Sequence, residues 1–315
     1  MTPMPNDATR VHAVVVAWRP DPLDLQALLQ RLQNQVEHVW IVDNTSPGEG
    51  QVEACLPPDR LRQPGLSLLC QHRNLGIATG FNIGLRAALA AGASHVLLSD
   101  QDSLPAEDMV VRLLEAERSL LAQGKSPAAV GPGFSNAVNG RPFRFQVFSE
   151  DGCRCDEVVA DAGMPLFEVG ALISSGSLIR AEVLAAVGLM RDELFIDYVD
   201  IEWCHRARAK GYTCHVCAAA ALGHQLGERP LRVWAGRWRT LTEHSPLRLY
   251  FQARNAIWLI RQPYIALWYR RNQPRFLLGR FYAYGGFSSR RLASLQMLFR
   301  GVWDGLRGRM GGPPT

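Results

Sequence analysis

The sequence has no apolar run long enough to cross a membrane. Its best candidate, residues 256–260, is followed at once by Arg261, Gln262 and Pro263, whereas a spanning helix needs about 18 or more apolar residues in succession. The first ten residues are polar and lack the basic and apolar regions of a secretory signal. We therefore expect a cytoplasmic protein, either free or held peripherally on the inner face of the cell membrane.

Metal-binding cysteine motifs are also lacking. Seven cysteines are present, but no four ligands have the spacing of a zinc finger. We therefore expect reduced thiols rather than a disulfide framework. A zinc site built from Cys214, Cys217, His215 and His224 is the less favoured alternative. The simpler interpretation is that Cys214 and Cys217 are small residues of a half-buried strand.

Lysine is absent from residue 228 onward, and acids are scarce there. That segment holds 16 arginines and three acids, so it carries +13, whereas residues 1–227 hold 18 basic and 26 acidic residues and carry −8. The composition separates an acidic body (1–227) from a basic, aromatic-rich extension (228–315). Such an extension indicates anionic partners, either phospholipid or a diphosphate-bearing substrate. Nucleic acid is not expected, because the extension has no recognisable nucleic-acid motif.

The first part of the chain alternates strand-like and helix-like patterns. The expected strands are residues 11–17, 39–42, 66–70 and 96–98, and the expected helices are 20–33, 77–91 and 104–123. This β-α-β-α alternation predicts a mostly parallel sheet with helices on both faces.

The pattern is less regular after Lys125. It predicts strands at 143–148, 169–173 and 212–217 and a helix at 200–210. In the extension it predicts helices at 247–260 and 292–306 and a frayed tail at 308–315. The arginine stems of the extension could cover apolar surface of the body. We favour the alternative that these helices lie on a membrane interface, where arginine and aromatic residues are typical.

Polar side chains follow the predicted strands where they end. Asp43 follows the second strand, Asn74 and Gly76 the third, and Asp100 and Asp102 the fourth. Because the carboxyl ends of parallel strands meet at one edge of a sheet, we expect these residues to face one crevice. Two carboxylates spaced i, i+2 suit Mg²⁺ or Mn²⁺. Taken alone, Asp-x-Asp and Asp-Asn are also common turn formers.

In this order, the motifs resemble those of family 2 inverting glycosyltransferases with the GT-A fold. The similarity covers roughly residues 10–226. The matching segments are Val14-Val15-Val16, Val42-Asp43-Asn44-Thr45-Ser46, Asn74-Leu75-Gly76-Ile77-Ala78, Leu98-Ser99-Asp100-Gln101-Asp102-Ser103, Ser175-Gly176-Ser177 and residues 195–206. Within the family, residues 195–203 and His224-Gln225-Leu226-Gly227 look like the bacterial rhamnosyltransferase branch.

The resemblance implies an α/β fold: a GT-A, Rossmann-like, mostly parallel central sheet in residues 1–227 with helices on both faces, and a C-terminal helical extension in 228–315. It implies an inverting, metal-dependent transfer of L-rhamnose from dTDP-L-rhamnose to a saccharide or lipid-linked saccharide, in cell-surface polysaccharide synthesis. A UDP-sugar-dependent transferase of the same fold is the alternative. A sugar nucleotidyltransferase is disfavoured, because residues 17–22 contain no glycine-rich triphosphate loop.

The resemblance also implies roles for individual residues. Asp200 matches the general base, and Asp102, Asp100 and His224 match ligands of the divalent cation. Donor-nucleotide contacts fall on Asp43, Arg73, Asn74, Gly76 and Asp100. Acceptor contacts fall on Ser175, Gly176, Trp203 and Glu202.

Several of these roles have a simpler alternative. Arg73 could be a solvated charge, His224 a structural histidine and Trp203 a buried helix residue. Asp197 or Glu202 could share the role of Asp200, because the segment departs from the usual Glu-Asp-x-Asp pattern. A separate segment holding Arg248, Arg254 and Asn255 resembles the Arg-Asn motif that follows the catalytic domain in this family. These residues either meet a lipid diphosphate or pack locally.

Overall fold

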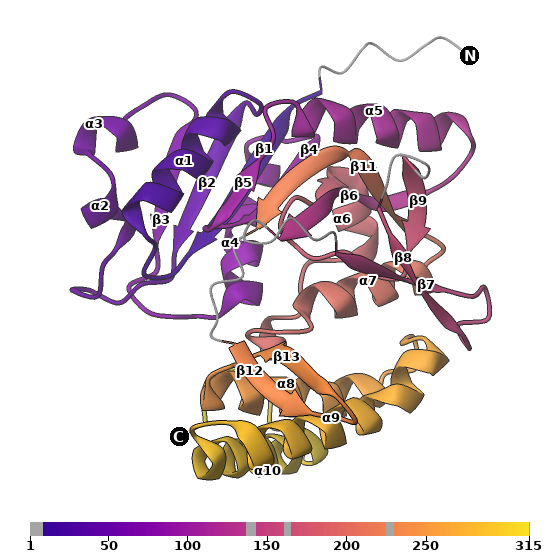
Figure 1. The fold of residues 1–315 in the computed structure, drawn as a ribbon. Coiled ribbons are helices and arrows are strands. Elements are labelled where there is room, and N and C mark those ends of the chain that lie inside the picture. Colours follow the sequence, from indigo (N-terminus) through magenta and orange to yellow (C-terminus); the bar gives the residue numbers. More distant parts are fainter. Residues whose placement is uncertain (1–8, 137–142, 161–164, 225–229, 315) are drawn as a thin grey trace.

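The body of the protein is one nine-stranded sheet with helices on both faces (Figure 1). The computed structural model describes residues 9–136, 143–160, 165–224 and 230–314. The main path of the sheet has the strand order β3-β2-β1-β4-β10-β6-β11-β5, and β9 pairs with β11. The strands are β1 (Val11–Ala17), β2 (His38–Asp43), β3 (Leu66–Cys70), β4 (His95–Asp100), β5 (Ser103–Pro105), β6 (Pro127–Asn136), β9 (Leu166–Val169), β10 (Leu178–Arg180) and β11 (Thr213–His224).

The helices of the body connect and cover these strands. Figure 1 shows α1 and α5 in front of the sheet and α4 behind it. The helices are α1 (Pro22–Gln33), α2 (Val52–Cys55), α3 (Pro58–Leu61), α4 (Ile77–Ala90), α5 (Met109–Ala122), α6 (Ala181–Val187), the 3₁₀ turn η1 (Asp192–Leu194) and α7 (Val199–Ala209). The expectation of a mostly parallel sheet covered on both faces is confirmed.

Parallel pairing brings the carboxyl ends of the central strands to one edge. β1 is buried along its whole length and pairs in parallel with β2 on one side and β4 on the other. Asp43 is in register with Ala17, and Asp100 is in register with Val16. The two acids therefore flank the end of β1, where ligands of open α/β sheets bind.

Two glycines let α4 approach the sheet closely. A Cβ at Gly80 would lie 2.7 Å from Val16, and one at Gly84 would lie 2.2 Å from Val14. Larger residues would push the helix away from β1. The close approach fixes Gly76, directly before α4, beside the carboxyl edge of the sheet.

The second half of the body differs from several expectations. β5, β6, β10 and α6 were not predicted, and the helix expected at 104–123 begins at Met109 because residues 103–105 pair with β11. The strand expected at 169–173 is displaced to β9, and β11 continues past Cys217 to His224. The continuation follows an irregularity between Cys217 and Ala221, where β11 shifts its register against β6. The strand expected at 143–148 is present as β7 (Arg144–Phe148), paired with β8 (Cys155–Val159).

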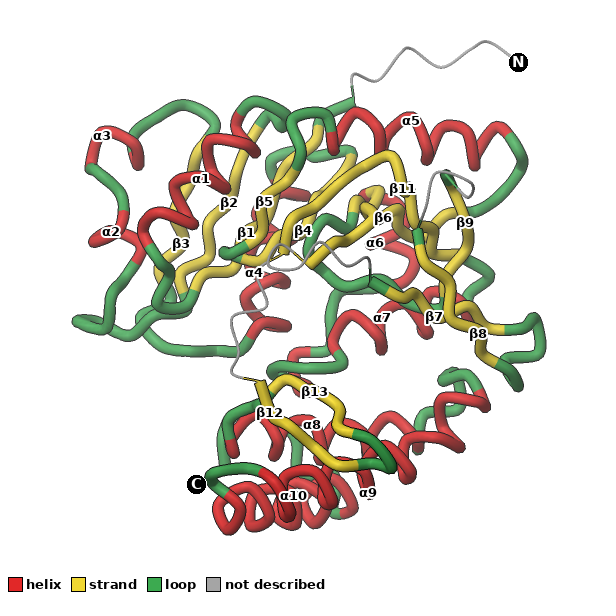
Figure 2. The backbone as a smooth tube through the Cα atoms, in the orientation of Figure 1, coloured by secondary structure: helices red, strands yellow, loops and turns green. Residues whose placement is uncertain are grey.

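The basic extension is a helical layer with one hairpin. Figure 2 shows β12 (Pro230–Trp234) and β13 (Trp238–Thr242) lying over α8 (Pro246–Ile260), α9 (Leu267–Phe287) and α10 (Arg291–Leu306). The predicted helices α8 and α10 are confirmed, whereas the hairpin and α9 were not predicted. Among the described residues, none of the helices combines the length and apolarity needed to cross a bilayer.

The segment expected to fray is instead attached. The Gly311 N–H donates to the Glu193 carbonyl at 2.8 Å, and the Gly311 carbonyl accepts from Arg254 at 2.6 Å. The prediction of a frayed tail was wrong because it ignored these tertiary hydrogen bonds.

We predict that Gly301→Ala destabilises the protein whereas Gly279→Ala does not. A Cβ at Gly301 would lie 2.4 Å from the Tyr250 carbonyl oxygen of α8, but one at Gly279 meets nothing within 4 Å. Overpacking of this kind costs about 1–3 kcal/mol, whereas Ala in an exposed helix gains roughly 0.5–1 kcal/mol over Gly. Urea unfolding of the two variants measures the difference. Equal effects would contradict the close α8–α10 packing.

Candidate active site

Two acids at the end of β4 form the floor of the site. Asp100 is the last residue of β4 and Asp102 follows two residues later, both partly buried. The Asp100 N–H donates to the Ser175 hydroxyl at 3.1 Å, and this hydroxyl also lies 2.7 Å from that of Ser103. The buried Ser175 and Ser103 thus fix the backbone on both sides of Asp102.

Asp100 lies among other carboxylates. Burial, together with the nearby charges of Asp102 and Asp200, raises the pKa of Asp100 to about 7, against the opposing charge of Arg248. These three acids therefore lie close enough for their charges to interact, although they come from different parts of the chain. The site concentrates negative charge that a cation would neutralise.

Asp100 and Asp102 provide carboxylate oxygens, which are the ligands that hard divalent cations such as Mg²⁺ and Mn²⁺ prefer. Among the described residues, no group of three or more histidine, cysteine or acidic side chains is arranged to hold a metal. His224 pairs with Ser103, so its backbone lies next to Asp102. The side chain of His224 and the rest of the motif, residues 225–227, lie outside the described part.

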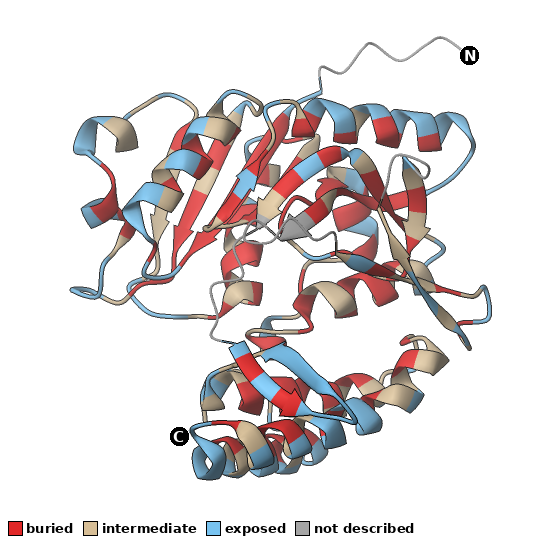
Figure 3. Ribbon diagram, in the orientation of Figure 1, coloured by how far each residue is buried: buried red, intermediate tan, exposed pale blue. Residues whose placement is uncertain are grey.

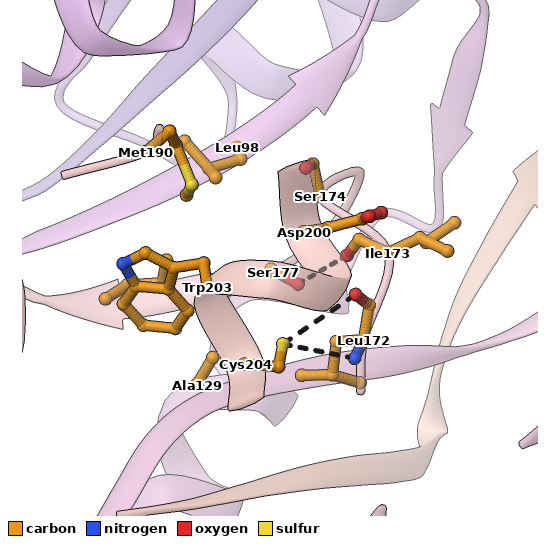
Figure 4. Close-up of a pocket in the computed structure, with 11 residues that line it drawn as sticks. Leu98, Ala129, Leu172, Ile173, Ser174, Ser177, Met190, Asp200, Trp203 and Cys204 are labelled. Carbon is orange, nitrogen blue, oxygen red and sulfur yellow. Dashed lines mark hydrogen bonds between the residues drawn. The ribbon is translucent and has the colours of Figure 1, made fainter. Parts of the chain in front are cut away.

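Asp200 sits in the first turn of α7. Its Oδ1 accepts from the Ile201 N–H at 2.8 Å. Burial raises the pKa of Asp200 to about 6, against hydrogen bonds from the Ile201 and Ser174 backbone that favour the charged form. Figure 4 shows its carboxylate beside Ser174 and Ile173, on the opposite side of the helix from Trp203. A carboxylate with a pKa near 6 is ionised at pH 7 and is a stronger base than an ordinary aspartate.

The loop that leads into α7 is strained. Phe195, Asp197 and Tyr198 have φ angles of 65°, 61° and 66°, a region that costs non-glycine residues about 1–3 kcal/mol each. The Phe195 carbonyl accepts from the Ile77 N–H at 2.7 Å at the start of α4. Through this bond, the loop before Asp200 contacts the loop that contains Gly76.

Two buried residues of α8 hold the strained loop. The Asn255 amide nitrogen lies 2.9, 2.8 and 3.0 Å from the carbonyl oxygens of Leu194, Ile196 and Asp197. Arg254, which is completely buried, donates to the Leu194 carbonyl at 3.0 Å. Of the two alternatives for these residues, local packing is therefore what the structure shows.

Arg248 behaves differently from its neighbours on α8. Its guanidinium lies 3.2 Å from the Asp197 carboxylate, and its side chain is 39% exposed. This places a cation of the extension beside the carboxylates of the body. Arg248 is therefore an ion-pair partner of Asp197 at the boundary between the extension and the body.

The predicted donor residues differ in exposure. Asp43 is buried, and its two oxygens accept from the Thr45 and Val52 N–H groups at 2.9 and 2.8 Å. Hydrogen bonds from an aspartate to nearby backbone N–H groups are typical of a residue that stabilises a turn. Arg73 and Asn74 are exposed, and Asn74 accepts from the Gly76 N–H at 2.9 Å.

Gly76 is needed for the shape of this loop. It has φ +85°, and a Cβ there would lie 2.6 Å from Phe195. The Gly76 carbonyl accepts from the buried Asn44 at 2.9 Å. The loop therefore joins the ends of β2 and β3 to the strained loop before α7.

The predicted acceptor residues are all buried. Ser175 and Gly176 lie beside the end of β4, and the Gly176 N–H donates to the Leu98 carbonyl at 2.8 Å. Trp203 is 2% exposed and donates to the Gly188 carbonyl at 2.8 Å. Glu202 is fully buried and accepts from Arg206 at 2.8 Å. In the described conformation all four residues pack inside the protein, so none of them lies at the surface where an acceptor could reach it.

Sequence reasoning missed two residues at the end of β1. Gln101 bridges the strand end, because its Oε1 accepts from the Trp18 N–H at 2.6 Å and its Nε2 donates to the Trp18 carbonyl at 3.2 Å. Trp18 is 46% exposed at this edge. The sequence did contain a signal for Trp18: it directly follows the buried strand β1, and a large aromatic residue at a strand end lies outside the core of the sheet.

We predict that Asp200→Asn stabilises the metal-free protein above pH 6. The folded state keeps the Asp200 proton up to about pH 6, whereas an unfolded aspartate loses it near pH 4. Stability therefore falls as the pH rises from about 4 to 6, and asparagine removes this loss. We expect a gain of about 1–2 kcal/mol at pH 8 and none at pH 4, measured by thermal unfolding. The exposed Asp59→Asn is the control. A gain independent of pH would contradict the prediction.

Comparison with known proteins identifies relatives of this chain. No protein-family model matches the chain. The chain is 30% identical to the dTDP-rhamnosyl transferase RfbF of Shigella flexneri over 259 residues, which cover 82% of each protein. It is also 30% identical to the galactofuranosyltransferase GlfT1 of Mycobacterium tuberculosis over 260 residues, which cover 80% of this chain and 83% of GlfT1.

Solved structures show the same fold at low sequence identity. GalNAc-T7, solved with UDP, GalNAc and Mn²⁺, aligns with a TM-score of 0.56 at 12% identity over 85% of this chain and 55% of that chain, so this protein spans about half of GalNAc-T7. TarS of S. aureus (1–349), solved with UDP-GlcNAc, aligns with a TM-score of 0.52 at 12% identity over 95% of this chain and 92% of that chain. The chain belongs to the GT-A glycosyltransferases of the family 2 type.

Proposed function

We propose that the protein is an inverting, metal-dependent transferase that moves L-rhamnose from dTDP-L-rhamnose to a hydroxyl of a saccharide acceptor. The observation that carries this proposal is the group of three interacting carboxylates, Asp100, Asp102 and Asp200, at the carboxyl edge of the sheet. The choice of rhamnose is supported by the similarity to RfbF. A lipid-linked saccharide acceptor in cell-surface polysaccharide synthesis fits the same proposal.

In the proposed reaction Asp200 is the general base. The acceptor hydroxyl oxygen forms a bond to the anomeric carbon as the bond from that carbon to the diphosphate oxygen breaks. Asp200 takes the hydroxyl proton, and the nucleoside diphosphate leaves with the electron pair of the broken bond. The raised pKa of Asp200, about 6, supports this role because a base near the working pH transfers protons efficiently.

Asp100 and Asp102 are the residues that would hold the cation. A bound Mg²⁺ or Mn²⁺ stabilises negative charge on a departing diphosphate. His224 is a further candidate ligand on the neighbouring strand. Arg248 lies near enough to Asp100 for their charges to interact, and its partly exposed guanidinium is proposed to contact a diphosphate oxygen as well as Asp197.

The donor nucleotide is proposed to lie across the end of β1. Asn74 and Arg73 are exposed beside it, and the backbone at Gly76 allows close approach. The buried Asp43 carboxylate orders the loop that borders the base, and its remaining lone pairs are available to the imide of thymine.

A galactofuranosyl or other UDP-sugar donor is the second candidate. GlfT1 is a galactofuranosyltransferase with the same identity to this chain as RfbF. The two candidates use the same carboxylates and differ in the sugar and base pockets. Direct comparison of donors therefore separates them.

Purified protein is expected to release dTDP from dTDP-L-rhamnose when Mn²⁺ and a saccharide acceptor are present. Asp200→Asn should lower kcat by about 10²–10⁴-fold, the usual contribution of a general base, and leave the donor Kd within about twofold, because Asp200 acts on the acceptor. Coupled detection of the nucleoside diphosphate and calorimetry measure the two quantities, with Asp59→Asn as the control. Turnover of UDP-sugars alone would favour the second candidate, and no turnover of any nucleotide sugar would overturn both.

We predict that Asp102→Asn raises the Mn²⁺ concentration needed for half-maximal rate by about tenfold or more. The substitution keeps the volume of the side chain but removes a charged oxygen from the proposed cation site. Titration of Mn²⁺ after treatment with EDTA measures the effect. Full activity of the wild-type protein in EDTA would contradict the metal assignment.

A further inference from the structure

The helix α10 has two faces with different partners. The face turned to α8 carries small residues, and Gly301 and Gly305 lie so close to α8 that a Cβ would approach its backbone oxygens to 2.4 and 2.7 Å. Leu298 on the same side is fully buried. The face toward the body is thus completely filled by α8.

The outward face of α10 is a stripe of large apolar side chains. Leu292 is 85%, Phe299 64%, Trp303 53% and Leu306 56% exposed. Their spacings of seven, four and three residues place all four on one side of the helix. More than half of the surface of each of these side chains faces solvent, although the opposite face of α10 is already buried against α8.

The stripe extends onto α9. The rings of Phe281 and Phe299 contact each other with their centroids 4.8 Å apart. On α9, Leu278 is 69% and Tyr282 54% exposed, one helical turn apart. The apolar surface therefore spans two neighbouring helices of the extension, of which α10 lies farthest from the sheet in Figure 1.

This apolar surface is concentrated in one part of the molecule. Among the described residues, eleven of the seventeen exposed large apolar side chains lie between Trp234 and Leu306. Figure 3 shows that the hairpin strand β13 is also exposed along its length. A solvated protein surface normally carries such residues singly, so a cluster marks an interaction surface.

Arginines border the stripe. Arg291 and Arg300 of α10, Arg307 directly after its end, and Arg271 and Arg275 of α9 are all exposed. The guanidinium of Arg307 lies 4.1 Å from the centre of the Trp303 ring. Basic and aromatic residues around an apolar stripe are the composition of helices that lie in a membrane interface.

We propose that α9 and α10 dock the protein on an anionic phospholipid surface, with the outward stripe of Leu292, Phe299, Trp303 and Leu306 entering the headgroup region. The net charge of the extension, +13, favours an anionic membrane over a second copy of the protein as the partner of this stripe. Two copies of the extension would repel each other, whereas an anionic bilayer attracts it and accepts the apolar stripe.

Vesicle co-sedimentation without any sugar donor tests the proposal, so the result is independent of the reaction proposed above. The full-length protein is expected to bind vesicles of phosphatidylcholine with phosphatidylglycerol, and to bind pure phosphatidylcholine vesicles much more weakly. High salt should weaken the binding, because the attraction is partly electrostatic.

A triple variant tests the stripe itself. L292S/W303S/L306S should lower the partition coefficient by about tenfold or more, with an unchanged unfolding temperature because these three side chains are mostly exposed. The matched control, L23S/V111S/L121S, removes three exposed apolar residues from α1 and α5 and should bind as the wild type does. Emission of Trp303, obtained by difference from Trp303→Phe, should shift to shorter wavelength on binding.

Three results would overturn the proposal. The first is equal binding to neutral and anionic vesicles, and the second is equal loss in the control variant. The third is a dimer in light scattering that the triple variant abolishes while vesicle binding is absent, which would assign the stripe to contact between copies of the chain.

Discussion

A single buried amide holds the loop that borders the candidate active site. The Asn255 nitrogen contacts three carbonyl oxygens of a loop in which Phe195, Asp197 and Tyr198 all have positive φ. Such a loop would relax if its carbonyl groups could find other donors. Because Asn255 and Arg254 are both fully buried on α8, these groups have fixed partners, and Asp200 is presented from a constrained loop.

The same loop connects the two halves of the site. Its Phe195 carbonyl receives the first N–H of α4, and its ring closes the space beside Gly76. The Phe195 ring in turn stacks on Phe251 of α8 at 4.8 Å. The donor side, the proposed base and the basic extension therefore form one packed unit, although their residues are far apart in the sequence.

The sequence predicted those parts of the fold that local patterns determine. β1 and α1 were recognisable from a valine run and a leucine stripe, and their bounds agree closely with the structure. α9 could not be found in this way, since it contains Pro274 and several glycines and is held by packing on its neighbours. β5 is only three residues long and exists because β11 pairs with it.

The same distinction, between features set by local sequence patterns and features set by tertiary contacts, applies to the candidate site. Residues at strand ends, such as Asp100, could be placed from the order of elements. The burial of Ser175 and Glu202 could not, because it depends on partners that only the tertiary structure brings near.

The attachment of Gly311 bears on how the protein reaches its active form during synthesis. The central strands β1 to β4 can pair as soon as residue 100 has left the ribosome, but Arg254 receives one of its carbonyl partners only from Gly311. The loop before Asp200 therefore gains its partners on α8 before the contact of Arg254 with Gly311 completes this region. Strands β1 to β4 could pair on the nascent chain before this happens, but the loop at Gly76 contacts Phe195, so the donor side and the proposed base would reach their final arrangement together.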